Sequence, residues 1–207
     1  MSELKEQFSL LRDFLRTRFR RIFLLCAVVF IVAGMVGYFV GVSNPDLVES
    51  MIQSFFTNAE NAGVIQEDGS ISTMALLANN WTAMLIAAAY GFIPFAFVPV
   101  TSLILNGFFL GISAALYHLN DLSLLSWLSG ILPHGIFELT SLVLSVACGV
   151  HLCISINHAI LRSPKRTTMI ETLCDLLRVL IFLVAPMTIA AAFIEVYLTP
   201  LFMALFM

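Results

Sequence analysis

Charged residues are scarce in this sequence: they make up 11% of its 207 residues, whereas 60% are hydrophobic. From Ser70 to Asn120 there is no Asp, Glu, Lys or Arg at all. A soluble domain needs far more polar surface than this, so the composition excludes a soluble protein. About 20 apolar residues cross the ~30 Å hydrocarbon core of a bilayer as a helix. The several long apolar stretches therefore predict an all-α, multi-pass membrane protein.

The sequence also lacks the common motifs of enzymes. It contains no HExxH zinc-peptidase motif, no GxSxG nucleophile turn and no glycine-rich phosphate loop ahead of a helix. The EExxxR pattern of the intramembrane CAAX-type proteases is also missing. We therefore predict that the protein is not an enzyme. All basic residues lie beside predicted membrane spans, so nucleic-acid binding is not expected either.

Two further absences concern targeting and redox state. The N-terminal region is too long in both its charged and its apolar part for a secretory signal peptide, and no small-residue cleavage site follows. The first span is therefore expected to be retained. No cysteine lies in a predicted outer loop, so no disulfide is expected. The cysteines also match no zinc-binding spacing; they are Cys26, Cys148, Cys153 and Cys174.

The few charges are segregated along the chain. Every Lys and Arg lies within residues 5–21 or 162–178, whereas residues 46–68, after the first apolar run, carry only acids. Cytoplasmic segments of membrane proteins are rich in Lys and Arg. Both basic segments are therefore predicted to be cytoplasmic, which places the N-terminus in the cytoplasm and the acidic loop outside.

A single membrane domain, residues 1–207, is predicted. Five spans satisfy both basic segments, and the charge-free stretch is divided into two spans at Pro94 and Pro99. Residues 124–132 are too apolar for a loop and are predicted to form a short half-inserted helix. The predicted spans are 22–42, 79–97, 101–118, 135–157 and 179–199.

Amphipathic helices are predicted outside the spans. Residues 1–21 have the apolar spacing of a cytoplasmic interfacial helix. The outer loop, residues 43–78, contains a helix that lies on the outer leaflet or caps the bundle; a partner-binding helix would have the same pattern. Residues 162–178 contain a second cytoplasmic amphipathic helix, in which Asp175 and Arg178 face away from the apolar side.

Glycines recur on one side of two predicted spans. Gly34, Gly37 and Gly41 lie near one side of the first span, and Gly107 and Gly111 form a GxxxG pattern in the third. Small residues let transmembrane helices approach closely. These faces are therefore predicted to contact another helix, and a homo-oligomer formed through them is one interpretation.

A small set of polar residues falls inside the predicted spans. They begin the second span, begin the fourth and end the fifth, and all three places are on the outer side. Counting at ~1.5 Å per residue puts them at one depth in the outer half of the bundle. The residues expected to converge are His134, Glu138 and Glu195, assisted by Asn79 or Asn80. Asn106, inside the third span, is predicted as a further structural polar residue.

This polar set contains two carboxylates that no nearby Lys or Arg neutralises, although burying a carboxylate in hydrocarbon is costly. Three interpretations remain open: a structural hydrogen bond, a bound divalent cation, and a path for protons or substrate. His134 and Glu138, four residues apart, project from one helix face as two metal ligands would. If His134, Glu138 and Glu195 bind a metal, one imidazole with carboxylate oxygens suits Zn²⁺ or Mn²⁺.

Three motifs carry a resemblance to a known family: NNW at 79–81, LNGFFLG at 105–111 and LPHGIFEL at 132–139. In this order, and over about residues 10–200, they resemble the stage II sporulation protein M family. The resemblance implies a multi-pass protein of the bacterial or archaeal plasma membrane. In spore formers it implies a part of the engulfment machinery that recruits or anchors cell-wall hydrolases, the stage II sporulation proteins D and P.

Two hypotheses for function follow. The first is a non-enzymatic membrane scaffold that organises envelope-remodelling hydrolases through the outer helix at 45–60 and the half-inserted segment at 122–132. The rival is a small transporter or cation-handling protein that uses the His and Glu residues as a path, with prolines breaking its helices. Membrane lipids are partners in both, and no cofactor beyond a divalent cation is expected.

Overall fold

Helices make up nearly all of the structure. The computed structural model describes residues 2–205, and among these residues no β-strand occurs; one β-bridge joins Ile65 to Ile71 within a loop. The predicted all-α fold class is confirmed. The α-helices are α1 (Ser2–Phe14), α2 (Arg20–Ser43), α3 (Pro45–Asn61), α4 (Thr73–Ala89), α5 (Pro99–Leu119), α6 (Leu124–Ile160), α7 (Met169–Val179), α8 (Ala185–Phe193) and α9 (Thr199–Ala204).

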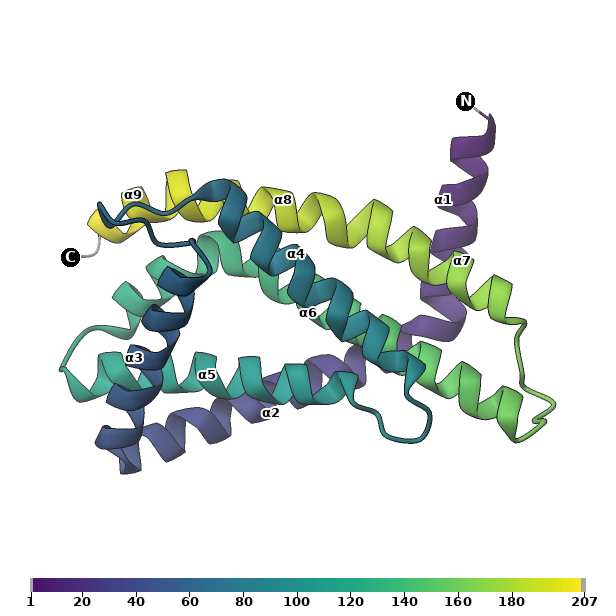
Figure 1. Cartoon of the computed structure of the whole chain (residues 1–207), viewed down its shortest axis with the longest axis horizontal. Coiled ribbons are helices and arrows are strands. Elements are labelled where there is room, and N and C mark those ends of the chain that lie inside the picture. Colours follow the sequence, from purple (N-terminus) through teal and green to yellow (C-terminus); the bar gives the residue numbers. More distant parts are fainter. Residues whose placement is uncertain (1, 206–207) are drawn as a thin grey trace.

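Short segments with other helical geometry connect several of these helices. Three are π-helical and join α-helices without a break, so that α1 continues into α2 and α7 continues through α8 into α9 (Figure 1). The fourth is a 3₁₀ turn that ends the helix begun by α4. They are η1 (Leu15–Phe19), η3 (Leu180–Val184), η4 (Ile194–Leu198) and the 3₁₀ turn η2 (Tyr90–Phe92).

Within residues 2–205, four helical stretches are long and apolar enough to cross a membrane: Glu3–Ser43, Pro99–Leu119, Leu124–Ile160 and Met169–Ala204. The sequence predicts one more span at 79–97. There the structure has the 17-residue α4 followed by η2, so the helix starts earlier and ends at Phe92, two residues before Pro94. α4 packs against α6 and α8 and is therefore part of the helix bundle (Figure 1). The count of five spans stays a prediction.

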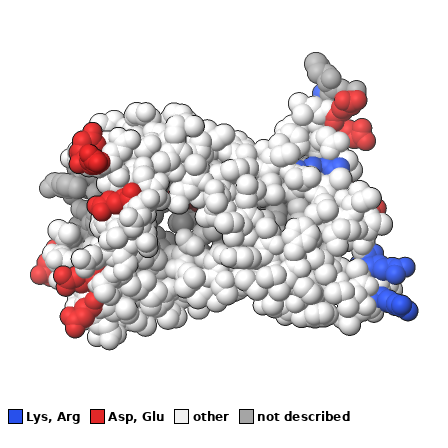
Figure 2. All heavy atoms as spheres, in the orientation of Figure 1, with Lys and Arg blue, Asp and Glu red and all other residues white. Residues whose placement is uncertain are grey.

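Positive charge lies at one end of the molecule only. Figure 2 shows Lys and Arg at one end, with some acidic residues beside them, and acidic residues alone at the other end. We call the acidic end, near residues 44–72, the outer end and the basic end the inner end, following the positive-inside rule. α1 at the inner end and α3 at the outer end both lie across the direction of the long helices (Figure 1).

The outer helix α3 caps the bundle. Val48 is 1% exposed and packs in a small core with Ile112 and Ala115 of α5, and Met51 and Ile52 are partly buried against the same core. The apolar side of this amphipathic helix therefore packs against α5 of the same chain. Phe55 and Phe56, further along the helix, remain exposed.

The two glycine faces contact each other. A Cβ on Gly37 would collide with the backbone of Phe108, and one on Gly111 would collide with the carbonyl of Gly34. Helices α2 and α5 therefore touch backbone to backbone, which only glycine permits. These faces are filled by packing within one chain, so they are not free for the self-association that the sequence suggests. A homo-oligomer stays a prediction, without a surface assigned to it.

The N-terminal helix is fixed to the cytoplasmic helix α7. Gln7 accepts a hydrogen bond from Arg178 Nε at 2.7 Å, and Arg178 Nη1 is 2.8 Å from Asp175 Oδ1. Arg18 Nη2 is 3.5 Å from the other oxygen of Asp175. The prediction that Asp175 and Arg178 face away is wrong, because α1 covers that face of α7 and buries Asp175 to 6% exposure.

Helix α6 is one element of 37 residues, not a half-inserted helix followed by a span. The hydroxyl of Ser123 accepts a hydrogen bond from Leu125 N at 3.1 Å and starts it. Pro133 lies inside the helix, where it removes one N–H from the ladder. Figure 1 shows α6 bent, and an internal proline is a usual cause of such a bend.

Two side chains of α6 contact the turn between η2 and α5, and one of them is Cys153, whose Sγ donates to Ile93 O at 3.4 Å. Phe95 and Phe97 both adopt positive φ, 61° and 47°, which is unfavourable for bulky residues. Phe95 N donates to Asn157 Oδ1 at 3.0 Å, across 62 positions of sequence. Asn157 is buried at the inner end of α6, so it ties the turn to the bundle.

Replacing Asn157 with alanine is expected to lower the free energy of unfolding by about 1–2 kcal/mol, because Phe95 N loses its partner in a partly buried place. The midpoint of thermal unfolding in detergent and proteolysis at residues 93–98 measure this. Asn120→Ala is the matched control, since the exposed Asn120 bonds only to Leu116 of its own helix. Equal effects of the two substitutions would argue against the tie.

Candidate functional site

The polar residues predicted at one depth come from two packed elements. His134 and Glu138 lie on α6, one helical turn apart, directly after Pro133. Glu195 lies in η4, the π-helical segment between α8 and α9. Because α6 packs against α8, η4 and α9, side chains from the two elements can meet near the outer end.

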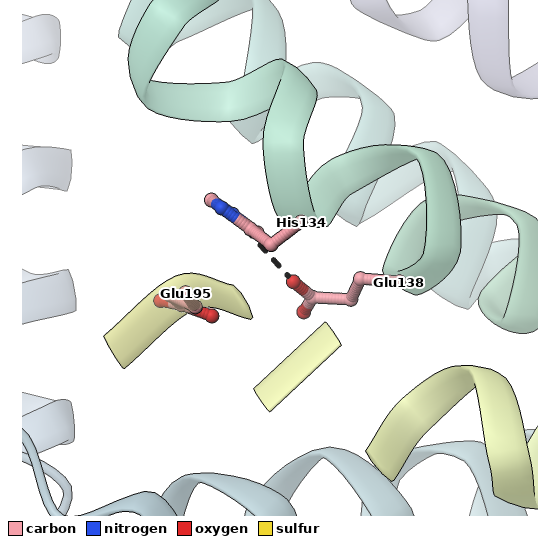
Figure 3. A group of neighbouring side chains, drawn as sticks. All are labelled: His134, Glu138 and Glu195. Carbon is pink, nitrogen blue, oxygen red and sulfur yellow. Dashed lines mark ion pairs between the residues drawn. The ribbon is translucent and has the colours of Figure 1, made fainter. Parts of the chain in front are cut away.

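The structure brings His134, Glu138 and Glu195 together. One nitrogen or oxygen of each lies within 4.8 Å of the others, and His134 Nε2 is 3.9 Å from Glu138 Oε2. Figure 3 shows the three side chains grouped between α6 and η4. His134 is buried, whereas the side chain of Glu138 is 29% exposed and Glu195 is partly buried. The group therefore lies at the edge of the packed interior.

Thr199 is a member of this group that the sequence does not reveal. It is 6% exposed at the start of α9, and its Oγ1 lies 3.1 Å from His134 Nδ1. The same Oγ1 donates to the carbonyl of Ile194 at 3.2 Å, five residues back in the π-helical turn. A threonine before a proline is common in sequences, so only the contact across 65 positions identifies it.

The three asparagines named with the cluster behave differently. Asn80 is buried on α4, and its Nδ2 has no hydrogen-bond partner among residues 2–205. Asn79 is exposed, because successive residues of a helix point in different directions. Asn106 is also exposed and donates to Ser102 O of its own helix at 2.8 Å. Asn79 and Asn106 therefore do not belong to the buried polar set.

Further polar groups continue inward along α6. Ser141 and Ser145 are fully buried. Thr188 of α8 donates to the carbonyl of Val184 at 2.8 Å, and its Oγ1 lies 3.1 Å from Met84 Sδ and 3.5 Å from Ser141 Oγ. His151 is buried against the ring of Phe14, with centroids 5.1 Å apart. Within the described chain neither nitrogen of His151 has a hydrogen-bond partner. The sequence alone predicts that a lone histidine in the middle of the fourth span is a core residue with satisfied hydrogen bonds, and for His151 this prediction is wrong.

Positive charge is remote from the cluster. All Lys and Arg of the sequence lie within residues 5–21 and 162–178, and those visible in Figure 2 gather at the inner end. Among the described residues the cluster also has no salt bridge to Lys or Arg. The two carboxylates must therefore be neutralised by protons, by His134 or by an ion.

Comparison with known proteins decides the family. The family described as Stage II sporulation protein M matches residues 26–200. The chain belongs to this family. It is also 30% identical over 126 residues to an uncharacterized protein of Methanocaldococcus jannaschii, which covers 61% of this chain and 70% of that protein. No solved structure matches the sequence.

The motifs that carry the family resemblance have visible structural roles. LNGFFLG, residues 105–111, supplies Gly107 and Gly111 to the backbone contact with α2. LPHGIFEL, residues 132–139, supplies both α6 residues of the polar cluster. The NNW motif of this family member lies in α4, where its tryptophan is partly buried against the main core.

Proposed function

We propose that this chain is a membrane scaffold that holds envelope-remodelling enzymes at its outer end. Membership of the stage II sporulation protein M family supports the proposal. The observation that carries it is the outer helix α3, which is fixed to the bundle through Val48 yet leaves Phe55 49% and Phe56 51% exposed. Exposed aromatic residues on a rigid support are typical anchors of protein interfaces.

The partners proposed are cell-wall hydrolases of the kind that the family resemblance implies, the stage II sporulation proteins D and P. Asp46, Glu49 and Glu60 accompany the two phenylalanines on α3 and are not neutralised by any ion pair among the described residues. An acidic surface with aromatic anchors suits a partner that presents basic and apolar side chains close to the membrane.

Binding of purified hydrolases to the protein in nanodiscs tests the scaffold. We expect the wild type to bind a stage II sporulation protein D or P, and the double substitution Phe55→Ala with Phe56→Ala to weaken binding roughly 30-fold, as loss of a hot spot does. The matched control is Leu24→Ala with Leu25→Ala, two exposed apolar residues of α2.

Two outcomes would contradict the scaffold. One is that neither hydrolase binds. The other is that vesicles containing only this protein cleave peptidoglycan and that Glu138→Gln abolishes the cleavage, which would make the protein an enzyme.

A second candidate function, transport of protons or small cations, is favoured by the buried polar groups of α6. Ser145 Oγ and both nitrogens of His151 have no hydrogen-bond partner within residues 2–205, and Ser141 lies between them and the outer cluster along the helix. Liposomes containing the protein would then show a proton or cation flux that Ser145→Leu blocks. Flux equal to that of empty liposomes would remove this candidate.

A further inference from the structure

The geometry points to a divalent-cation site formed by His134, Glu138 and Glu195, in which Thr199 sets the orientation of the histidine. This site is independent of hydrolase binding, because it lies between α6 and η4 and does not involve α3.

The hydrogen bonds of Thr199 determine which nitrogen of His134 carries the proton. Thr199 Oγ1 has one hydrogen, and the carbonyl of Ile194 at 3.2 Å can only accept it. Both contacts of Thr199 are therefore hydrogen bonds only if its oxygen accepts from His134. His134 Nδ1, at 3.1 Å, is then the donor. In the neutral ring Nε2 is left with a lone pair, and Nε2 is the nitrogen nearest Glu138. Metal-binding histidines are commonly oriented by such a bond from their other nitrogen.

Three acceptors therefore face one point. The 3.9 Å between His134 Nε2 and Glu138 Oε2 is too long for a direct hydrogen bond. Ligands bound at about 2.0–2.2 Å from one zinc ion lie roughly 3–4 Å apart, and all three ligand atoms lie within 4.8 Å of one another. The spacing leaves room for an ion between the ligands and needs only small side-chain shifts to close on it.

The π-helical segment η4 separates the ligand Glu195 from the supporting residue Thr199 at the start of α9. A π-helical turn holds about one more residue than an α-helical turn, and such turns are frequent at functional sites. η4 runs from Ile194 to Leu198, so Glu195 lies near its start, Thr199 follows directly after its end, and both reach α6.

Charge and access also favour a cation. Two carboxylates lie side by side, with no Lys or Arg paired to them among residues 2–205, and burying unpaired carboxylates is strongly unfavourable. The Glu138 side chain is 29% exposed, so the group is not sealed inside the bundle. Three protein ligands leave a coordination position for water, as in open zinc sites. One imidazole with carboxylate oxygens suits Zn²⁺ or Mn²⁺.

Metal analysis tests the site directly. The full chain is purified without chelator and without a histidine tag, and its metal content is measured by mass spectrometry. We expect about one Zn²⁺ or Mn²⁺ per chain, in line with one site. Removal of the metal should lower the midpoint of thermal unfolding, and titration with Zn²⁺ or Mn²⁺ should restore it.

Three variants separate ligand, positioning and surface effects. Glu195→Gln is expected to weaken metal affinity at least roughly 100-fold, and Thr199→Val by about 10–100-fold, as loss of an orienting bond does. Thr199→Ser keeps the hydroxyl and should restore wild-type affinity, which a purely structural role of this residue would not require. Glu60→Gln, an exposed acid on α3, is the control and should have no effect.

The inference is overturned if the wild type contains no stoichiometric metal and shows no stabilisation by Zn²⁺ or Mn²⁺, since the wild-type measurement does not depend on any variant folding. It is equally overturned if Glu195→Gln, monodisperse on size exclusion, binds either metal as the wild type does. Failure of hydrolase binding would refute the scaffold alone and leave the metal content unchanged.

Discussion

A Gly37→Ala chain is expected to lose about 3 kcal/mol of stability, the upper end of the usual cost of overpacking. The obstacle is backbone: the new Cβ would collide with the carbonyl of Phe108 and approach its Cα to 2.9 Å. Neither helix can turn a side chain aside to make room. α2 and α5 must therefore move apart, and the core between them opens. Thermal unfolding in detergent, followed by size exclusion, measures the loss.

Gly34→Ala is the matched control in the same contact. Its Cβ would meet only the carbonyl of Gly107, at 3.4 Å, which is an ordinary van der Waals distance. We expect a change within about 0.5 kcal/mol, or a slight gain, because alanine favours the helix over glycine. Equal losses for both substitutions would contradict the register of α2 on α5.

Asp175→Ala is expected to detach α1 from α7 and to cost about 3–5 kcal/mol, the range for breaking a buried ion pair. Asp175 is 6% exposed and is paired with both Arg178 and Arg18. Without it two guanidinium groups lose their partner, and the bond from Arg178 to Gln7 loses its support. Proteolysis within residues 2–19 should become faster, as a cleavage time course would detect.

Asp13→Ala is the control for this substitution, because Asp13 is 67% exposed and lies 3.9 Å from Arg12. Exposed pairs contribute little to stability. If Asp13→Ala released α1 as readily as Asp175→Ala, the ion pairs of Asp175 would not be what attaches α1 to α7.

The sequence was sufficient for the fold class because the relevant signal is a bulk property. Long apolar runs need no partner to be recognised, and the segregation of Lys and Arg from the outer acids is visible without structure. The contact between His134 and Glu195 could also be predicted. Polar side chains at the same depth of a membrane bundle point toward its interior, where they meet. The motifs at 105–111 and 132–139 gave the family.

What the sequence could not provide were the contacts that depend on which helix faces which. Asp175 reads as a solvent-facing acid on an amphipathic helix, and only the position of α1 buries it. Gly37 and Gly111 indicate close packing but not whether the neighbour belongs to the same chain. Thr199 joins the cluster because η4 is π-helical, and no simple residue pattern predicts that geometry.

The backbone contact between α2 and α5 also has a mechanical consequence. Packed interiors deform little, and here no flexible side chain lies between Gly37 and Phe108 to absorb a displacement. We therefore expect α2 and α5 to move together as one rigid unit, with α3 packed across their outer end. If the bilayer changes in thickness, we expect the other helices to adjust their positions, among them α6 and η4, which carry His134 and Glu195.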